Sequence, residues 1–438
     1  MSSEDTVVAI ATPPGRGGIG VIRLSGPLSR KICKKITKKD IEPGRFLFTK
    51  FYRTDETIID SGICLFFQSP HSYTGEDVAE FQTHGSDPIL KSLLEEIISN
   101  GARHARPGEF TERAFINNKM DLIQAESVLE LINSKSMRAA KSALRSLEGV
   151  FSEEIQCIQS ALVKAKSLIE AGLDFPDEED VEIDYAPAIS SIDGALTRAR
   201  SLLNNAETGE ALTHASQVVI AGKPNVGKSS LLNKLLGNDV AIVSDISGTT
   251  RDVIKQPAYI DGIELLLIDT AGIRQTSDVI EREGVRRSTE NIKKADLVLY
   301  VVDDDNYELV EKPTCKTFIV RNKIDIRPIK QNIEDQNIVA ISVNTGEGMP
   351  ELIEAIKIAL GIDADEENSV VARERHIIAL KKIVACLEEA QVFLQKNLEP
   401  EVASEQLRQA LNHFDEILGK VTADDILGEI FSRFCIGK

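Results

Sequence analysis

The feature that most constrains this 438-residue chain is a glycine-rich loop that matches the pattern GxxxxGK[ST] from Gly222 to Ser229. A short apolar, β-rich run at 217–221 precedes it, and leucines at helical spacing follow it. In a strand–loop–helix unit of this kind, backbone N–H groups curl around phosphate oxygens at a helix N-terminus, where the helix dipole also favours negative charge. Lys228 then reaches the β- and γ-phosphates, and the Ser229 hydroxyl ligates Mg²⁺. The flanking pattern favours a nucleoside-triphosphate site over a simple glycine turn.

Three later motifs specify the nucleotide and the reaction. Thr250, in GTT, lies where a switch threonine closes over Mg²⁺ and the γ-phosphate, while Asp269 ends an apolar strand and is placed to hold the water shell of the metal. Gly272, in DTAG, leaves a backbone N–H free to meet the γ-phosphate. In NKID, the Asp325 carboxylate accepts both N–H donors of a guanine edge, whereas adenine would leave this carboxylate unpaired. The set predicts a GTPase in which Lys228, Thr250 and Asp269 take part in hydrolysis.

One position departs from the Ras-type pattern. Ile273 follows DTAG, where Ras-type GTPases place the glutamine that orients the attacking water. An apolar side chain cannot orient water, so another group must do so.

Length, charge and cysteines limit the class of protein. A chain of this length divides into two or three domains, because single cores stop growing at roughly 250–300 residues. Six cysteines without a CxxC pair, no basic leader and no long apolar segment predict a soluble, cytoplasmic protein with reduced thiols and no membrane contact. The formal net charge of −18 argues against a sequence-independent grip on nucleic acid. An RNA substrate would need a local basic patch or a partner protein.

Hydrophobic periodicity predicts a multidomain fold. Residues 1–118 alternate β-rich runs with helices around 28–38 and 88–100, which indicates an α+β domain. Apolar residues then recur at three- and four-residue steps, with Gly149 as a possible break, and helical spacing resumes from Arg373. We expect an all-α helical domain whose two parts, 119–213 and 362–438, flank an inserted α/β P-loop G domain at 214–361.

Some segments have a plain and a functional interpretation. GRGGIG at 15–20 fits GxGxxG, but β-branched residues follow it where a dinucleotide site needs a helix, so we expect a glycine turn or close backbone approach. The polar clusters YTGED at 73–77, THG at 83–85 and RPGEFTERAF at 106–115 are expected to be loops, solvated or functional. The tail FCIGK fits prenylation poorly, and we expect it to dock on the protein.

Motifs spread along the whole chain resemble those of the MnmE (TrmE) family of bacterial tRNA-modification GTPases. They are ATPPGRGGIGVIRLSG, YTGEDVAEF, RPGEFTERAFINNKMDLIQAE, DFPDEED, GKPNVGKSSLLN, DISGTTRD, DTAGIR and the terminal FCIGK. Several lie outside the G domain, so the resemblance is more specific than a GTPase signature.

This resemblance implies a homodimer, dimerised through its N-terminal domain, that works with the flavoprotein MnmG. Together they would install an aminomethyl or carboxymethylaminomethyl group on C5 of the wobble uridine of certain tRNAs. A tetrahydrofolate derivative, 5-formyl- or 5,10-methylene-tetrahydrofolate, would bind the N-terminal domain. The positions that match the folate-binding residues of the family are Arg23, Glu80, Lys119 and Lys438.

The resemblance also supplies a substitute for the missing glutamine. In the family, G domains pair across the nucleotide with K⁺ beside the phosphates, where an arginine finger would otherwise lie. The matching K⁺ ligands are Asn225, Ser244, Ile246 and Thr249, and Mg²⁺ would be held by Ser229 and Thr250. Glu281 matches the residue that positions the attacking water through a second water.

The complete set of expected GTP-binding residues combines the motifs with these matches. It comprises Asn225, Val226, Gly227, Lys228, Ser229, Ser230, Ser244, Asp245, Ile246, Ser247, Gly248, Thr249, Thr250, Asp269, Thr270, Ala271, Gly272, Asn322, Lys323, Asp325, Ser342, Val343 and Asn344. Two features depart from the family. The loop that backs the guanine reads Ser-Val-Asn instead of Ser-Ala-Lys, and the segment after 301–305 is short.

A second function stays open at this point. A non-enzymatic, GTP-controlled switch in RNA or ribosome assembly would share the GTPase motifs and use the N-terminal region only to dock RNA. Saturable folate binding would distinguish the modification enzyme from such a switch.

Overall fold

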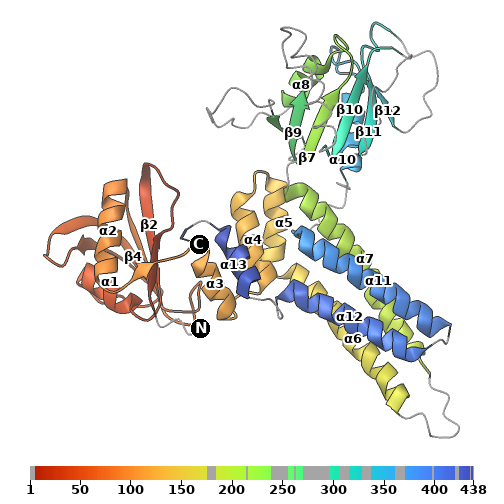
Figure 1. Cartoon of the computed structure of the whole chain (residues 1–438). Coiled ribbons are helices and arrows are strands. Elements are labelled where there is room, and N and C mark those ends of the chain that lie inside the picture. The colour runs from red at the N-terminus through yellow and green to blue at the C-terminus, as the bar shows by residue number, and fades with distance from the viewer. Residues whose placement is uncertain are drawn as a thin grey trace. The chain divides into compact units, whose positions relative to one another are not determined.

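The computed structural model describes residues 5–174, 184–213, 216–237, 255–260, 263–269, 295–304, 315–327, 337–360, 370–396, 399–419, 424–434 and 436–437 (Figure 1). It divides into two compact units, one of Met1–Leu129 with Leu411–Lys438 and the other of Glu130–Ala410. Within the described ranges no helix is both long and apolar enough to cross a membrane.

The first unit is built on a six-stranded sheet in the order β3-β4-β5-β2-β1-β6. The strands are β1 (Val7–Ile10), β2 (Gly17–Ser25), β3 (Phe46–Tyr52), β4 (Ile58–Phe67), β5 (Val78–Gly85) and β6 (Arg103–His104). Their pairing is antiparallel except between β1 and β6. Helices α1 (Ser29–Thr37) and α2 (Asp87–Ser99) contribute apolar side chains to the core of the sheet. These elements confirm the predicted α+β domain and its first two helices.

One sequence prediction for this unit was wrong, because the segment 106–115, predicted as a polar loop, contains helix α3 (Glu109–Ile116). Residues 83–85 form the end of strand β5. Local composition misled the prediction, because Phe110 and Ala114 are fully buried and the buried Arg113 pairs with Glu76 and Asp5, far away in the sequence. The GRGGIG segment enters strand β2 and no helix follows it directly, which agrees with the rejection of a dinucleotide fingerprint.

The C-terminal tail packs on this unit, as predicted. Helix α13 (Asp424–Ser432) meets α3, where the Phe431 ring lies 6.4 Å from that of Phe115. Further along, Gly437 has φ +100°, and a Cβ there would lie 2.4 Å from the carbonyl oxygen of Ile10. This close approach to the end of β1 requires glycine.

The second unit contains most of the long helices. These are α4 (Leu122–Asn133), which begins in the first unit, α5 (Met137–Leu147), α6 (Val150–Asp174), α7 (Ala186–Thr213), α11 (Glu374–Gln395) and α12 (Pro400–Leu418), which ends in the first unit. The predicted apolar stripe is interrupted between α5 and α6 at Gly149, which has φ +97°. Where the chain re-enters the bundle, the Val370 N–H donates to the Asn205 carbonyl at 3.4 Å, so α7 and the start of the second helical part lie side by side.

Between α7 and α11 the chain forms a second six-stranded sheet, in the order β12-β11-β10-β7-β9-β8. The strands are β7 (Ser216–Ala221), β8 (Lys255–Ile260), β9 (Ile263–Asp269), β10 (Leu297–Val302), β11 (Lys316–Arg321) and β12 (Ile338–Ala340). All are parallel except the edge strand β8, and helices α8 (Lys228–Leu236) and α10 (Met349–Ala359) share their core. The carboxyl ends of β7, β9 and β11 therefore lie at the same edge of the sheet, where open α/β sheets bind ligands.

Cys33, Cys64, Cys157, Cys315 and Cys386 are free thiols. The described residues contain no group of three or more His, Cys, Asp or Glu side chains that would hold a metal ion.

Candidate functional sites

The loop between β7 and α8 has a backbone that only glycine permits at two points. Gly222 has φ +141°, and a Cβ there would lie 2.2 Å from the Val301 carbonyl oxygen. Gly227 has φ +103°, and its Cβ would lie 2.3 Å from the Asn322 side-chain nitrogen. Side chains at either place would force the loop away from β10 and from the NKID segment. The spacing of glycines in the motif thus has a direct geometric cause.

Lys228 starts α8 and folds back over this loop. Its side chain is largely buried, with the residue 6% exposed, and Nζ donates to the carbonyls of Gly222 and Lys223, both at 2.8 Å. Ser229 and Ser230 are exposed in the first helical turn, which holds no acidic residue. A buried ammonium, the N-terminus of a helix and exposed hydroxyls form a site suited to a polyphosphate and to a hard cation that prefers oxygen ligands.

Asn322 and Lys323 of NKID brace the phosphate loop. The Asn322 side chain is 3% exposed, donates to the Val226 carbonyl at 2.9 Å and accepts the Val343 N–H at 3.2 Å. Lys323 donates to the Asn225 carbonyl at 2.7 Å. NKID therefore ties the phosphate loop to the loop after β12.

Asp303 is a member of this brace that sequence reasoning missed. It pairs with Lys323 at 2.9 Å, and this hydrogen bond lowers the pKa of the Asp303 carboxyl. Asp325, in contrast, is exposed and lies two residues after Lys323. Asp303 is the first carboxylate of the run VVDDD, and nothing local connected it with Lys323.

The loop that would back the guanine is tight and partly buried. Ser342 is fully buried, its Oγ accepts the Thr345 N–H at 3.2 Å and its carbonyl accepts the Gly346 N–H at 2.8 Å. The turn leaves Asn344 exposed, while its neighbour Val343 is partly buried in the core beside the phosphate loop. The structure thus brings together the described residues of three nucleotide motifs, the phosphate loop, NKID and the Ser-Val-Asn loop.

The remaining expected nucleotide residues are outside the described part of the chain. They are Ser244, Asp245, Ile246, Ser247, Gly248, Thr249, Thr250, Thr270, Ala271, Gly272 and Glu281. Ile273 also lies outside it. Asp269 is described by its backbone alone, as the last residue of β9, where it pairs with Ile220 beside the phosphate loop.

A second candidate site lies on the sheet of the first unit. Arg23 on β2 faces its register partner Glu80 on β5, and the two form an ion pair of 2.8 Å with less than a fifth of either side chain exposed. The guanidinium also lies over two rings, 5.3 Å from the centre of Tyr73 and 5.8 Å from that of Phe110. Burial raises the pKa of the Tyr73 hydroxyl, which pairs with Thr111 at 2.9 Å. The arrangement offers a half-buried cation, a carboxylate and aromatic surface to an anionic, ring-bearing ligand.

A buried ion network holds the segments around Arg23 in place. The Arg113 side chain, 6% exposed, donates to Glu109 at 3.0 Å, to Glu76 at 3.0 Å and to Asp5 at 2.8 Å. Arg103 adds a second cation, 2.6 Å from Glu109. Burial alone would raise the pKa of Glu109, but the hydrogen bonds from Arg103 and its other donors outweigh burial and lower it to about 2. Sequence reasoning missed this network because its members lie up to 108 residues apart.

Of the two other expected folate-binding residues, the structure describes Lys119 but not Lys438. Lys119 is exposed, donates to the Pro70 carbonyl at 3.1 Å and packs against Gly75, in the loop that also carries Tyr73. Lys438 is outside the described residues, but Gly437 lies against Ile10, one residue beyond the β1 position that pairs with Arg23.

Comparison with known proteins covers both halves of the chain. The family model "GTP-binding protein TrmE N-terminus" matches residues 6–119, and the model "MnmE helical domain" matches residues 122–435. Among solved structures, the G domain of the T. maritima FeoB iron transporter is 29% identical over 33% of this chain and 99% of that chain, with a TM-score of 0.25.

Curated relatives match along the full length. A tRNA modification GTPase MnmE from Mannheimia succiniciproducens is 42% identical over 100% of both chains, and one from Coxiella burnetii is 43% identical over 99% of both. A third, from Laribacter hongkongensis, is 44% identical over 99% of both. The chain belongs to the MnmE family of tRNA modification GTPases.

Proposed function

We propose that this GTPase works with the flavoprotein MnmG to add a carboxymethylaminomethyl or aminomethyl group to C5 of the wobble uridine, position 34, of certain tRNAs. The one-carbon unit would come from 5-formyl- or 5,10-methylene-tetrahydrofolate. The observation that carries this proposal is that one chain holds both a phosphate loop and an Arg23 site with a carboxylate and two aromatic rings. A GTP-controlled assembly switch has no use for the second site.

The proposed domain organisation follows from the same chain path. The N-terminal folate-binding and dimerisation domain would span 1–118, and the helical domain would comprise 119–213 and 362–438 around a G domain at 214–361. Support comes from the hydrogen bond between Val370 and Asn205, which brings the chain back beside the helix it left. Insertion into a domain needs such neighbouring ends.

For GTP hydrolysis, the chain supplies positioning and charge. Lys228 would move from the loop carbonyls to the β- and γ-phosphates, and Asp325 would select guanine. Mg²⁺ would bind the Ser229 and Thr250 hydroxyls and, through water, Asp269, and would offset phosphate charge. The exposed Ser229 at the start of α8 and the position of Asp269 beside Ile220 support this assignment. Glu281 would orient the attacking water in place of the glutamine that Ile273 replaces.

We propose that K⁺ and pairing of two G domains make hydrolysis fast. Asn225 supports this, because it has φ +66° and an exposed side chain on the phosphate loop, while its carbonyl is fixed by Lys323. Ser244, Ile246 and Thr249 would complete the K⁺ site. GTP turnover per molecule should rise with protein concentration and should be faster in potassium than in sodium buffer.

Asn225→Gly tests the cation directly, because glycine keeps the positive φ and removes the side-chain oxygen. We expect turnover in this variant to become nearly equal in the two buffers. Lys223→Ala, at an exposed position of the same loop, should keep the difference. Equal rates for the unmodified protein would remove K⁺ from the mechanism.

The proposed folate site uses Arg23, Glu80, Lys119 and Lys438. A cation suits the glutamate tail of folate and a carboxylate suits the N–H donors of the pterin ring. Arg23→Met should weaken binding of 5-formyltetrahydrofolate by tenfold or more in a titration. Arg45→Met, which removes an exposed arginine paired with Glu42, should leave the affinity unchanged. No saturable folate binding to the unmodified protein would favour the assembly switch instead.

The homodimer is supported by an apolar area on the first unit. Phe46 and Phe48 on β3 are 72% and 69% exposed, and they pair with Leu65 and Ile63 on β4, so the four side chains share one face at the sheet edge. Exposed apolar patches of this kind are typical of interfaces. The double variant Phe46→Ser, Phe48→Ser should sediment as a monomer, whereas Met137→Ser, at a position equally exposed, should not.

Nucleoside analysis of tRNA tests the overall proposal. A deletion strain should lack the C5 modification at position 34, and re-expression of the chain should restore it. Unchanged wobble uridines in the deletion strain would exclude a role in this modification.

A further inference from the structure

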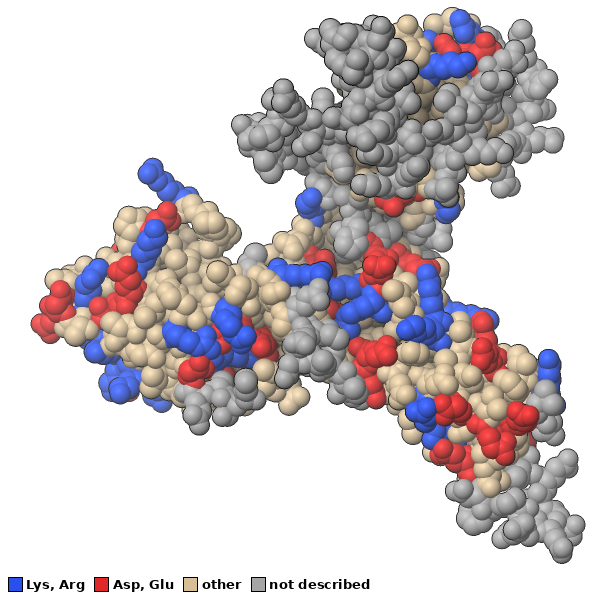
Figure 2. Space-filling model, in the orientation of Figure 1, with Lys and Arg blue, Asp and Glu red and all other residues tan. Residues whose placement is uncertain are grey.

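Helix α1 carries an excess of positive charge that is unusual for this acidic protein. Six of the ten residues from 30 to 39 are Lys or Arg and none is Asp or Glu, while the chain as a whole has a net charge of −18. Figure 2 shows Lys and Arg side chains gathered over α1, at the lower left of the N-terminal lobe. The apolar residues of α1, such as Ile32 and Ile36, are buried in the core, so the cations form its outer surface.

The cations form two rows in the sequence, which start on α1 and end just beyond its last residue, Thr37, where Lys38 has φ +55°. Arg30, Lys34 and Lys38 are spaced by four residues, and each pairs with a carboxylate, Asp40 for the first two at 3.5 Å and Glu56 for Lys38 at 3.0 Å. The second row consists of Lys31, Lys35 and Lys39. Among the described residues, none places a carboxylate oxygen within 4 Å of this second row.

Helix stability accounts for only part of this arrangement, because the helix dipole favours the positive charges of Lys34 and Lys35 in the last turn of α1. Arg30 and Lys31 lie in the first turn of α1, where the helix dipole disfavours positive charge and where no acidic residue offsets it. Like charges four residues apart also repel one another. Sequence choices that work against the local structure are typical of functional surfaces.

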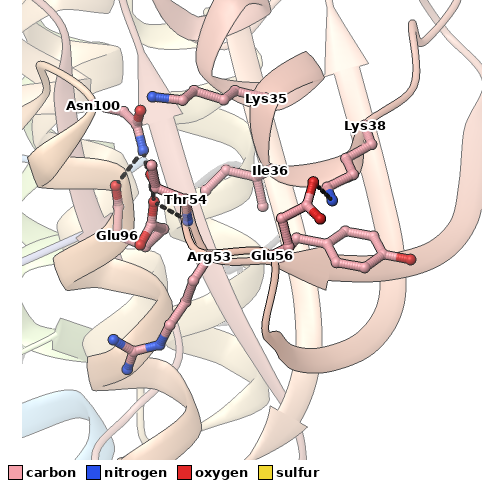
Figure 3. Close-up of a pocket in the computed structure, with 9 residues that line it drawn as sticks. Lys35, Ile36, Lys38, Arg53, Thr54, Glu56, Glu96 and Asn100 are labelled. Carbon is pink, nitrogen blue, oxygen red and sulfur yellow. Dashed lines mark hydrogen bonds and ion pairs between the residues drawn. The ribbon is translucent and has the colours of Figure 1, made fainter.

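A small cavity continues the cationic surface. It measures about 110 Å³ and is lined by Lys35, Lys38, Arg53, Glu56 and Glu96, with Ile36, Tyr52, Thr54 and Asn100. Figure 3 shows Lys38 on Glu56, and Glu96 held by Thr54 and Asn100. Both carboxylates are thus engaged by donors. Arg53 donates to the Ser92 hydroxyl at 2.7 Å and its charge also acts on Asp55, while Lys35 extends toward Asn100 without a marked contact.

We propose that the second row, Lys31 and Lys35 of α1 with Lys39 just after it, binds the phosphate backbone of tRNA together with Arg53 at the adjacent cavity. The inference rests on the proposed function, which requires a net-negative protein to hold a polyanion. Unpaired ammonium groups on one surface are what backbone phosphates need, and such contacts position RNA without reading its sequence. A bilayer is a poorer match, because helices that bind membrane surfaces present an apolar face and that of α1 is buried.

The test is tRNA binding to the full-length protein over a range of salt concentrations. Lys31→Ala, Lys35→Ala, Lys39→Ala removes three cations at exposed positions, and alanine favours helix, so α1 should persist. We expect at least tenfold weaker tRNA binding at low salt and a slope of log K against log salt that is smaller by about 2 to 3. GTP hydrolysis without tRNA should not change.

The control variant removes the same charge from exposed ion pairs on the helical bundle. Arg198→Ala, Arg200→Ala, Lys381→Ala breaks pairs with Glu154, Glu388 and Glu207 and likewise shifts the net charge to −21. If the α1 variant binds tRNA like this control, the proposal is overturned, while normal wobble modification in cells would leave the proposed function intact. The proposal would also be overturned if the α1 variant lost binding to anionic phospholipid vesicles but bound tRNA as the unmodified protein does. That result would assign α1 to membranes.

Discussion

The nucleotide site and the Arg23 site differ in what maintains their shape. Around the phosphate loop the important contacts run to backbone carbonyls, and the loop depends on positive φ at Gly222 and Gly227. Around Arg23 the contacts join side chains, and a buried network centred on Arg113 fixes the segments that carry them. We infer that ligand binding at the nucleotide site is lost when the backbone of the loop is changed. Binding at the Arg23 site should instead depend on the charges of the network, on pH and on each aromatic ring beside Arg23.

The largest effect should follow from removing the centre of the network. Arg113→Met leaves Glu109 and Glu76 buried with fewer cations, and removal of one partner from such a pair costs about 3–5 kcal/mol. Amide exchange in peptides from β1, β2 and α3 should accelerate about a hundredfold or more, since 1.36 kcal/mol corresponds to a factor of ten.

An exposed ion pair provides the control for this variant. Arg198→Met breaks a pair with Glu154 in which about half of each side chain is exposed, and such pairs contribute roughly 0–1 kcal/mol. If Arg113→Met and Arg198→Met change exchange equally little, the buried network does not hold the site together.

A somewhat smaller effect is expected at the nucleotide site, where a backbone change should lower the affinity for guanine nucleotides. Gly222→Ala places a Cβ 2.2 Å from the Val301 carbonyl oxygen at a φ that glycine alone tolerates well. We expect guanine-nucleotide affinity to fall by about a hundredfold, which is about 2.7 kcal/mol, in a titration with fluorescent GDP. Gly194→Ala in α7, where a Cβ meets nothing within 4 Å, should leave the affinity unchanged.

These two sites also show what a sequence can predict. The phosphate loop was found because its residues are contiguous and its spacing reflects local backbone geometry at Gly222 and Gly227. The Arg23 site was found through family resemblance alone, since no local pattern joins Arg23 on β2 to Phe110 on α3. Helix α3 itself was misjudged as a loop, because the partners that satisfy Arg113 lie as far away as Asp5.

The network should also make the first unit sensitive to acid. The pKa of Glu109 is lowered to about 2, below its ordinary value of 4.5, so its contribution is complete above about pH 4.5 and is lost as the pH falls toward 2. At pH 3 the loss relative to pH 7 should reach about 2 kcal/mol. Circular dichroism melts at pH 7 and pH 3 should show a smaller difference for Glu109→Gln than for the unmodified protein. An equal difference would assign the acid sensitivity to other groups.

The smallest effect concerns the ring beside Arg23. Tyr73→Leu removes a cation–π contact, which is worth about 1 kcal/mol at a half-buried site, so binding of 5-formyltetrahydrofolate should weaken about fivefold. Tyr73→Phe keeps the ring and loses the hydrogen bond to Thr111, so it separates the ring from the hydroxyl. If the phenylalanine variant binds like the unmodified protein and the leucine variant does not, the aromatic face orients Arg23. If both weaken equally, the hydroxyl bridge to α3 is what matters, and the Arg23 site depends on its hydrogen-bonded frame as strongly as the phosphate loop depends on its glycines.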